Sequence, residues 1–343
     1  MNKARIATVA GLALATLGLA QDGPYKVLKV AKVGGDGGFD YVYADSNGRK
    51  LYIPRSGTNQ RVTVFNLDTL APLGEITGLG GHGVAVDPKS HHGFASSKPV
   101  LMFDTETLKE MKKIEVQGNP DGIFYDSYNA RVWVFSHAKP HATIIEPKDG
   151  SIVGTIDDLG GAPEQAASDG KGHVWIDLED KDAIAAVDAK TLKVTTTYDI
   201  SSKGKGPAGL GYDPKNEVLF ATCRQPAMMV AVSAKDGKVL DAFPIGGGSD
   251  GGGFNPKTSE AFSSNGGDGT LTVVKSNGPT SFAPEQSLKT MPRAKTMTID
   301  EKTGHIFVIA AEYGQAPAAP APGQKGGRAP MVPDSFSIVM IGK

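Results

Sequence analysis

Three observations in the 343-residue sequence predict an all-β fold, a seven-bladed β-propeller with four-stranded blades. The chain has 44 glycines and 22 prolines, a composition typical of short strands joined by tight turns. A unit of roughly 42 residues recurs seven times, and each copy contains short β-type segments. The last unit lacks a segment that the beginning of the chain could supply. Together these features predict a closed ring of blades.

Each unit centres on a polar turn between two apolar segments, as in "VAVDPKSHHGFAS" and "LGYDPKNEVLFAT". An Asx side chain at the turn caps its own backbone. Successive turn residues are 42, 39, 43, 44, 42 and 45 positions apart, and an aromatic residue follows seven positions later, or six in the fourth unit. The turn residues are Asp45, Asp87, Asp126, Asp169, Asp213, Asn255 and Asp300, and the aromatic residues are Tyr52, Phe94, Trp133, Trp175, Phe220, Phe262 and Phe307.

The two ends of the chain predict how the ring closes. The last unit stops after its third β-type segment, "SFSIVMIGK", whereas "YKVLKVAKV" (25–33) precedes the first unit. Pairing these two segments completes the seventh blade and removes two exposed sheet edges. Residues 313–334 are rich in Pro, Ala and Gly and interrupt the last unit, so we expect a long loop there.

Residues 1–20 are typical of a secretory signal peptide. Lys3 and Arg5 precede an apolar run over 6–19, and the small residues Gly18 and Ala20 suit cleavage after position 20. The run is shorter than the roughly 20 residues that a transmembrane helix needs. We therefore expect a periplasmic or secreted protein, with 21–343 forming the propeller and no membrane span after cleavage.

Charge and cysteine content exclude several classes of protein. The 36 Lys and Arg residues nearly balance 37 Asp and Glu residues without a long basic run, so no nucleic-acid partner is expected. Cys223 is the only cysteine, so there is no internal disulfide, and stability must come from the core. We expect a monomer.

The repeat resembles the YVTN-type repeat of bacterial surface-antigen and YncE-like seven-bladed propellers, which are related to the NHL-repeat propellers. The segments "VFNLDTL", "MFDTETL" and "AVDAKTL" match the middle of that repeat. Its end, a Gly-x-Pro followed by a strand that finishes in Asp-Pro, is matched by "GNPDGIFYD" and "GPAGLGYDP". The resemblance covers essentially the whole chain after residue 20. It implies a binding module for a protein, a peptide or a small ligand.

Two positions in each unit are predicted to reach one mouth of the central channel, where propeller loops converge and ligands usually bind. One lies five residues before each turn residue, and the other lies four residues after each aromatic residue. Most of these positions, or their neighbours, carry ionisable side chains. The candidate ligand-binding residues are Asp40, His82, Asp121, Glu164, Asp250, Lys295, Arg55, His137, Arg224 and Glu312.

Three interpretations of this mouth stay open. The first is a binding site, which fits the resemblance and the lack of a recognisable catalytic set. The second is a metal-dependent hydrolase, lactonase or lyase with His82 as base or ligand, and with Ca²⁺ or another divalent cation held by oxygen ligands. The third is a water-filled channel lined by polar side chains. The cation ligands of the second interpretation are Asp40, Asp121, Glu164 and Asp250.

The glycine-rich stretch "IGGGSDGGGFNP" (245–256) looks like a phosphate-binding loop. Such a loop must lead into a helix, but a β-type segment follows here. The stretch is instead expected to cross from an outer strand to the next inner strand, where small residues fit the crowded centre. Asp250 then occupies the same mouth position as Asp40 and Asp121.

Overall fold

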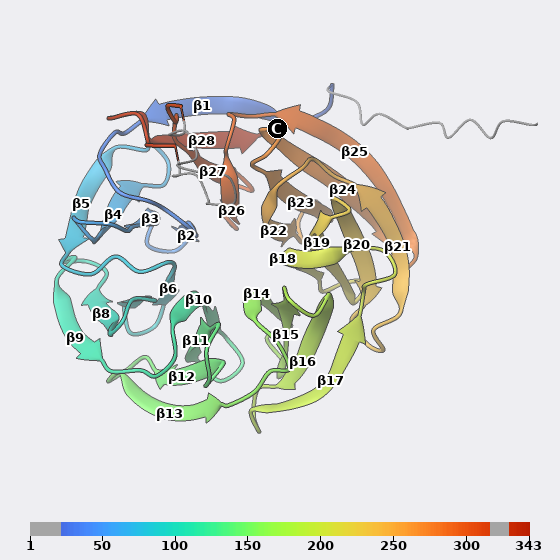
Figure 1. Cartoon of the computed structure of the whole chain (residues 1–343), viewed down its shortest axis with the longest axis horizontal. Coiled ribbons are helices and arrows are strands. Elements are labelled where there is room, and N and C mark those ends of the chain that lie inside the picture. Colours follow the sequence, from blue (N-terminus) through green and yellow to red (C-terminus); the bar gives the residue numbers. More distant parts are fainter. Residues whose placement is uncertain (1–21, 316–328) are drawn as a thin grey trace, which may run out of the picture.

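The computed structural model describes residues 22–315 and 329–343, which form seven four-stranded antiparallel sheets arranged in a ring (Figure 1). The first strand of each sheet lies next to the central channel, and the last lies at the rim. The predicted all-β, seven-bladed fold is confirmed. Within the described residues, no helix has the length and apolarity needed to cross a membrane. The predicted signal peptide, 1–20, lies outside the described residues.

The first three blades follow one another along the chain, each sheet pairing its strands in sequence order. Blade 1 contains β2 (Tyr43–Asp45), β3 (Lys50–Arg55), β4 (Arg61–Asn66) and β5 (Pro72–Thr77). Blade 2 contains β6 (Val84–Asp87), β7 (His92–Ala95), β8 (Val100–Asp104) and β9 (Glu110–Ile114). Blade 3 contains β10 (Pro120–Asp126), β11 (Arg131–Ser136), β12 (Ala142–Glu146) and β13 (Ser151–Ile156).

The next three blades repeat the same order. Blade 4 contains β14 (Pro163–Ser168), β15 (His173–Leu178), β16 (Ala183–Asp188) and β17 (Lys193–Asp199). Blade 5 contains β18 (Lys205–Asp213), β19 (Val218–Gln225), β20 (Met228–Ser233) and β21 (Val239–Pro244). Blade 6 contains β22 (Ser249–Asn255), β23 (Glu260–Asn265), β24 (Thr270–Gly278) and β25 (Ser281–Lys289).

Blade 7 joins the two ends of the chain, as predicted. Its strands run in the order β26 (Lys295–Ile299), β27 (Ile306–Ala310), β28 (Ser337–Gly342) and β1 (Lys26–Lys32). The N-terminal strand β1 pairs antiparallel with β28, so it supplies the missing outer strand. Of the predicted loop 313–334, the two ends pair through an isolated bridge between Tyr313 and Met331, and residues 316–328 lie outside the described residues.

The repeated turn and aromatic residues explain why every unit folds alike. All seven turn residues accept a hydrogen bond from the backbone N–H two positions later, which is the predicted Asx turn. All seven aromatic side chains are buried. They join apolar clusters that pack neighbouring blades together, such as the cluster of Tyr52 and Val64 in blade 1 with Val86 and Phe103 in blade 2. The core is therefore distributed between blades.

The glycine-rich stretch lies where blades 5 and 6 come closest, as the sequence predicts. Gly209 on β18 and Gly252 on β22 face each other, and a Cβ atom on Gly209 would lie 2.2 Å from the backbone nitrogen of Gly252. Only glycine permits this backbone approach. The stretch is therefore part of the packing around the channel.

Candidate functional site

The inner strands are irregular at the point where they reach the channel mouth. In blades 3 to 7, the pairing of the inner strand with its neighbour shifts register near its first residue. A β-bulge of this kind re-aims side chains away from the regular ladder. At the bulge in blade 7, Thr296 adopts a left-handed φ of 50°, which is rare for a β-branched residue and marks backbone strain. Its hydroxyl donates to the carbonyl oxygen of Asp40 at 2.6 Å.

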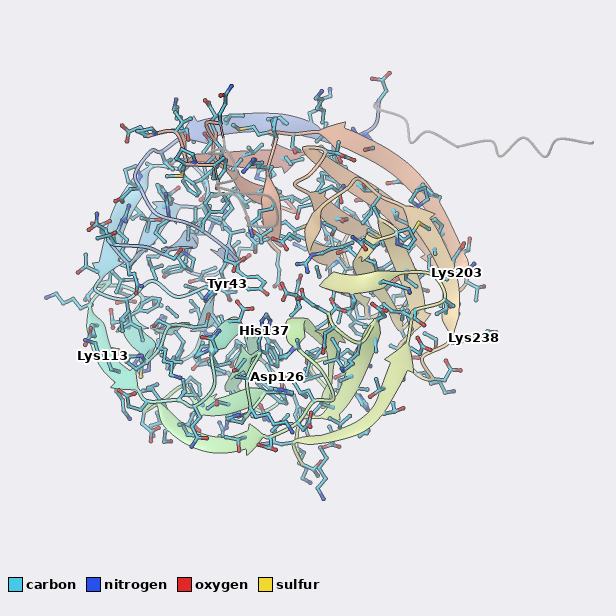
Figure 2. The ribbon with its side chains drawn as sticks, in the orientation of Figure 1. Tyr43, Lys113, Asp126, His137, Lys203 and Lys238 are labelled. Atoms are coloured by element: carbon cyan, nitrogen blue, oxygen red, sulfur yellow. The ribbon has the colours of Figure 1, made fainter. Side chains whose placement is uncertain are left out.

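Eight ionisable side chains close a ring around this mouth. Four carboxylates alternate with four basic groups, each carboxylate contacts two bases, and all seven blades contribute. Figure 2 shows His137 near the centre of the ring of blades, whereas Lys113, Lys203 and Lys238 lie at its outer edge. We call this set the charge ring. In order, its members are Asp40, His82, Asp121, His137, Glu164, Arg224, Asp250 and Lys295.

One half of the charge ring is built around Asp121. His82 Nδ1 lies 2.9 Å from Asp40 Oδ2 and 3.2 Å from Asp121 Oδ1. His137 Nε2 lies 3.0 Å from Asp121 Oδ2 and 3.4 Å from Glu164 Oε2. Asp121 therefore offers one oxygen to each imidazole.

The other half of the charge ring is built around Asp250. Arg224 Nη2 lies 2.6 Å from Asp250 Oδ1 and 3.8 Å from Glu164 Oε1, and Nη1 also contacts Glu179. Lys295 Nζ lies 2.6 Å from Asp250 Oδ2 and 3.3 Å from Asp40 Oδ1. Asp250 therefore forms ion pairs with two cations, the guanidinium of Arg224 and the ammonium of Lys295.

The charge ring shifts the pKa values of its basic members upward. Hydrogen bonds to Asp121 and Glu164 raise the pKa of His137 to about 10, and the hydrogen bond to Asp40 raises the pKa of His82. Burial alone would lower the pKa of Lys295, but the charges of Asp250 and Asp40 raise it. Each base is therefore held in its charged form by the neighbouring carboxylates.

The pKa values of two carboxylates of the charge ring are shifted in opposite directions by their surroundings. Burial alone would raise the pKa of Asp40, but the hydrogen bond from His82 and the charge of Lys295 bring it below its usual value. Burial raises the pKa of Glu164, and the negative charges of Asp121 and Glu179 add to this effect. The negative charge of Glu164 is therefore less well compensated than that of Asp40.

Two side chains span the channel beneath the charge ring. Tyr41 of blade 1 crosses the axis and donates its hydroxyl to the carbonyl oxygen of Glu164 in blade 4 at 3.2 Å. Gln165 of blade 4 reaches blade 6, donating to Gly252 O at 2.9 Å and accepting from Gly252 N at 3.2 Å. A cavity of about 160 Å³ remains further inside. The charge ring therefore forms the floor of the mouth, and its side chains pair with one another across the channel.

Two cavities adjoin the charge ring. One, of about 820 Å³, is lined by Asp40, His82 and Ser56 together with Met331 from the described end of the loop. The other, of about 470 Å³, is lined by Arg224, Ser249 and Asp250. Both cavities also share four lining residues, which are Phe39, Arg293, Lys295 and Tyr313.

Eight of the ten predicted ligand-binding residues come together in the charge ring, and two lie elsewhere. Arg55 is only 1% exposed, stacks 3.8 Å from the ring centre of Phe336 and donates to Gly37 O at 3.1 Å. It lies behind the residues that line the mouth, and burial lowers its pKa to about 10. Glu312 is exposed and lines neither cavity described above.

Two overlapping groups in the described residues could hold a metal ion. One consists of Asp40, His82 and Asp121, and the other of Asp121, His137 and Glu164. In each group the three ligand atoms lie within 4.8 Å of one another. Of the four predicted cation ligands, Asp250 belongs to neither group and pairs with Arg224 and Lys295 instead.

The sequence prediction omitted three residues of the mouth. Phe39 directly precedes Asp40, and Arg293 lies two positions before Lys295. Tyr313 was assigned only to the loop. Their neighbours in sequence were predicted, but nothing in the repeat distinguishes these positions, because each lies outside the two positions common to all units.

The fold and the charge ring define a seven-bladed β-propeller with a polar mouth above side chains that span the channel. Neither a family model nor a curated protein matches the sequence. Among many solved structures of similar fold, a chain in the crystal structure of the mitotic checkpoint complex is 11% identical with a TM-score of 0.67, and the match covers 90% of this chain and 94% of that chain. At this identity the likeness shows the fold alone.

Proposed function

We propose that this chain is an exported β-propeller of the YVTN type that binds an acidic small molecule or peptide at the mouth above the charge ring. The observation that carries the proposal is the shared wall of the two cavities. There, two aromatic side chains, Phe39 and Tyr313, stand beside two cationic ones, Arg293 and Lys295. Apolar surface together with a few polar groups is what small-ligand sites require.

Arg293 is the cation best placed to bind an acidic ligand. It is exposed, its guanidinium lies 4.3 Å from the ring centre of Tyr313, and it makes no ion pair with any residue that the structure describes. Arginine binds carboxylates through two parallel hydrogen bonds. Lys295, by contrast, already contacts Asp40 and Asp250. The free guanidinium therefore supplies the attraction for the anion.

The floor and the size of the mouth also suit such a ligand. Each carboxylate of the charge ring is paired with two bases, so the floor does not present uncompensated negative charge to an anion. The two cavities, about 820 and 470 Å³, fall within the roughly 300–1,000 Å³ typical of ligand sites. Because Tyr41 and Gln165 span the channel beneath, we expect the ligand to enter and leave through the mouth.

The ligand test uses the purified chain in a chelating buffer, with a panel of N-acetylated amino acids, acidic dipeptides and sugar acids. We expect members of the panel to raise the melting temperature, and Arg293→Gln to weaken their binding at least about tenfold, or about 1.4 kcal/mol. Isothermal titration calorimetry gives the dissociation constants.

Arg131→Gln is the matched control, because Arg131 pairs with Glu146 at 2.7 Å at the other end of blade 3. It should leave the dissociation constants unchanged. A panel without any stabilising member would contradict the proposal. So would ligands that bind equally well to wild type, Arg293→Gln and Phe39→Ala.

The export component is supported by the basic residues, apolar run and small residues of 1–20. We expect the mature protein from a host with a secretory pathway to begin at Gln21 and to be found outside the cytoplasm. N-terminal sequencing after fractionation measures both properties. A cytoplasmic protein that keeps Lys3 and Arg5 would argue against export and would leave the ligand site to its own test.

A further inference from the structure

In the half of the charge ring around Asp121, each imidazole presents one nitrogen to oxygens of two different carboxylates. His82 Nδ1 faces oxygens of Asp40 and Asp121, at 2.9 and 3.2 Å. His137 Nε2 likewise faces oxygens of Asp121 and Glu164, at 3.0 and 3.4 Å. An imidazole N–H carries one hydrogen, so the two oxygens that face it share that hydrogen in a three-centre arrangement. A cation placed among the three atoms would displace the proton of that imidazole nitrogen to solvent and contact all three atoms.

The spacing of these atoms fits metal coordination. Ligand atoms bound to one ion at about 2.0–2.2 Å lie about 2.9–3.5 Å apart in octahedral or tetrahedral geometry. The four nitrogen–oxygen separations, 2.9, 3.2, 3.0 and 3.4 Å, fall in that interval. The remaining separation in each group, between its two carboxylate oxygens, is within 4.8 Å, so the three atoms surround a space that one ion can occupy.

Asp121 is placed to bridge two ions. Its Oδ1 faces His82 and its Oδ2 faces His137, so each oxygen belongs to a different group of ligands. Its side chain is only 12% exposed, and its backbone oxygen accepts a hydrogen bond from Ser96 Oγ, which fixes its position. On either side, one further carboxylate completes a set of three, Asp40 with His82 and Glu164 with His137.

We propose that the charge ring binds two divalent transition-metal ions of the zinc, cobalt and manganese class, with Asp121 bridging them. One ion is held by Asp40, His82 and Asp121, and the other by Asp121, His137 and Glu164. Mixed imidazole and carboxylate ligands suit these ions, whereas Ca²⁺ prefers six to eight oxygens. Three protein ligands leave an open coordination position, and the cavity lined by Asp40 and His82 gives access to it.

This proposal differs from the cation site expected from the sequence and does not depend on the organic ligand proposed above. The expected set consisted of four carboxylates including Asp250, but Arg224 and Lys295 neutralise Asp250 and would repel a cation there. The ions are therefore confined to the Asp121 half. A divalent metal ion at the mouth is also what the hydrolase, lactonase or lyase interpretation requires.

The test uses the full chain after removal of metal with a chelator and desalting. Zn²⁺ titration by calorimetry and metal analysis of the dialysed protein should give two ions per chain, and Co²⁺ should produce visible absorption bands of nitrogen and oxygen coordination. His82→Ala and His137→Ala should each reduce the stoichiometry to one. Asp121→Ala should weaken binding at both sites at least about 100-fold, or about 2.7 kcal/mol.

His173→Ala is the matched control, because His173 also contacts a carboxylate, Asp169 at 2.7 Å, but in a turn away from the mouth. It should keep both ions. Circular dichroism verifies the fold of every variant, and if Asp121→Ala does not fold, Glu164→Gln reports the loss of one site. Binding of fewer than two ions, two ions retained in either mouth histidine variant, or tighter binding of Ca²⁺ than of Zn²⁺ would overturn the proposal.

Discussion

Tyr25→Ala is expected to lower the free energy of unfolding by about 4 kcal/mol, the loss typical of a buried aromatic side chain. Tyr25 is 2% exposed, and its ring packs edge-on against Phe262 at 5.4 Å. Its hydroxyl donates to Glu260, and its backbone exchanges two hydrogen bonds of 3.0 Å with Gln286. It therefore fastens the closing strand β1 to blade 6.

The same residue also couples the two ends of the chain. Lys343 Nζ lies 2.7 Å from Glu260 and 5.1 Å from the centre of the Tyr25 ring. Without Tyr25, β1 keeps its pairing with β28 but loses its anchor, and fraying would expose an unpaired edge of the seventh blade. The loss is therefore expected to affect closure of the whole ring.

Urea denaturation followed by tryptophan fluorescence measures this effect. Tyr25→Phe separates the two contributions, because it keeps the packing and loses only the hydrogen bond to Glu260, with an expected cost of about 1–3 kcal/mol. Tyr128→Ala is the control, since Tyr128 is 42% exposed, and should cost within about 0.5 kcal/mol. If Tyr25→Ala were as stable as Tyr128→Ala, the anchoring role would be wrong.

Arg224→Met is expected to lower the free energy of unfolding by about 3 kcal/mol, because it leaves partly buried carboxylates without their shared cation. Arg224 contacts Glu164, Glu179 and Asp250, and therefore links blades 4, 5 and 6. We expect the low end of the range for buried pairs, because its side chain is 35% exposed and water screens part of the interaction.

Urea is the appropriate denaturant for this measurement, since guanidinium chloride would screen the charges of the ring. Lys139→Met is the control: Lys139 pairs with Asp158 at the surface and is 52% exposed, so its loss should leave the free energy of unfolding close to that of the wild type. Adding Glu179→Gln to Arg224→Met should recover part of the loss, because one unpaired carboxylate is removed. Equal stabilities of Arg224→Met and Lys139→Met would show that the charge ring does not hold the blades together.

The blade number and the closure of the ring could be read from the sequence because both depend on local chemistry. An Asx turn and a buried aromatic residue recur in each unit, and each needs only nearby residues to form. The unpaired β-type segments at the two ends could satisfy their backbone only by pairing with each other. The seven sheets and the pairing of β1 with β28 in the structure confirm the predicted architecture.

The mouth position of each blade could also be predicted, because one register applies to every unit. Counting from the turn residue placed Asp40, His82 and Asp121 at the mouth, and counting from the aromatic residue placed His137 and Arg224 there. Arg55 lies away from the mouth, because its side chain points to the opposite face of the chain from that of its neighbour Ser56, which lines the larger cavity. It is buried against Phe336 instead.

The sequence alone determined the seven blades, the closing strand and the ionisable residues that face the mouth, because these follow from periodicity along the chain. Only the tertiary structure decided which acid meets which base. That pairing depends on bulges in the inner strands, on side-chain lengths and on the approach of residues far apart in sequence, such as Asp40 and Lys295. For the same reason, only the structure distinguishes the four carboxylates that the sequence places at equivalent positions. Asp121 lies between two histidines, whereas Asp250 lies between an arginine and a lysine.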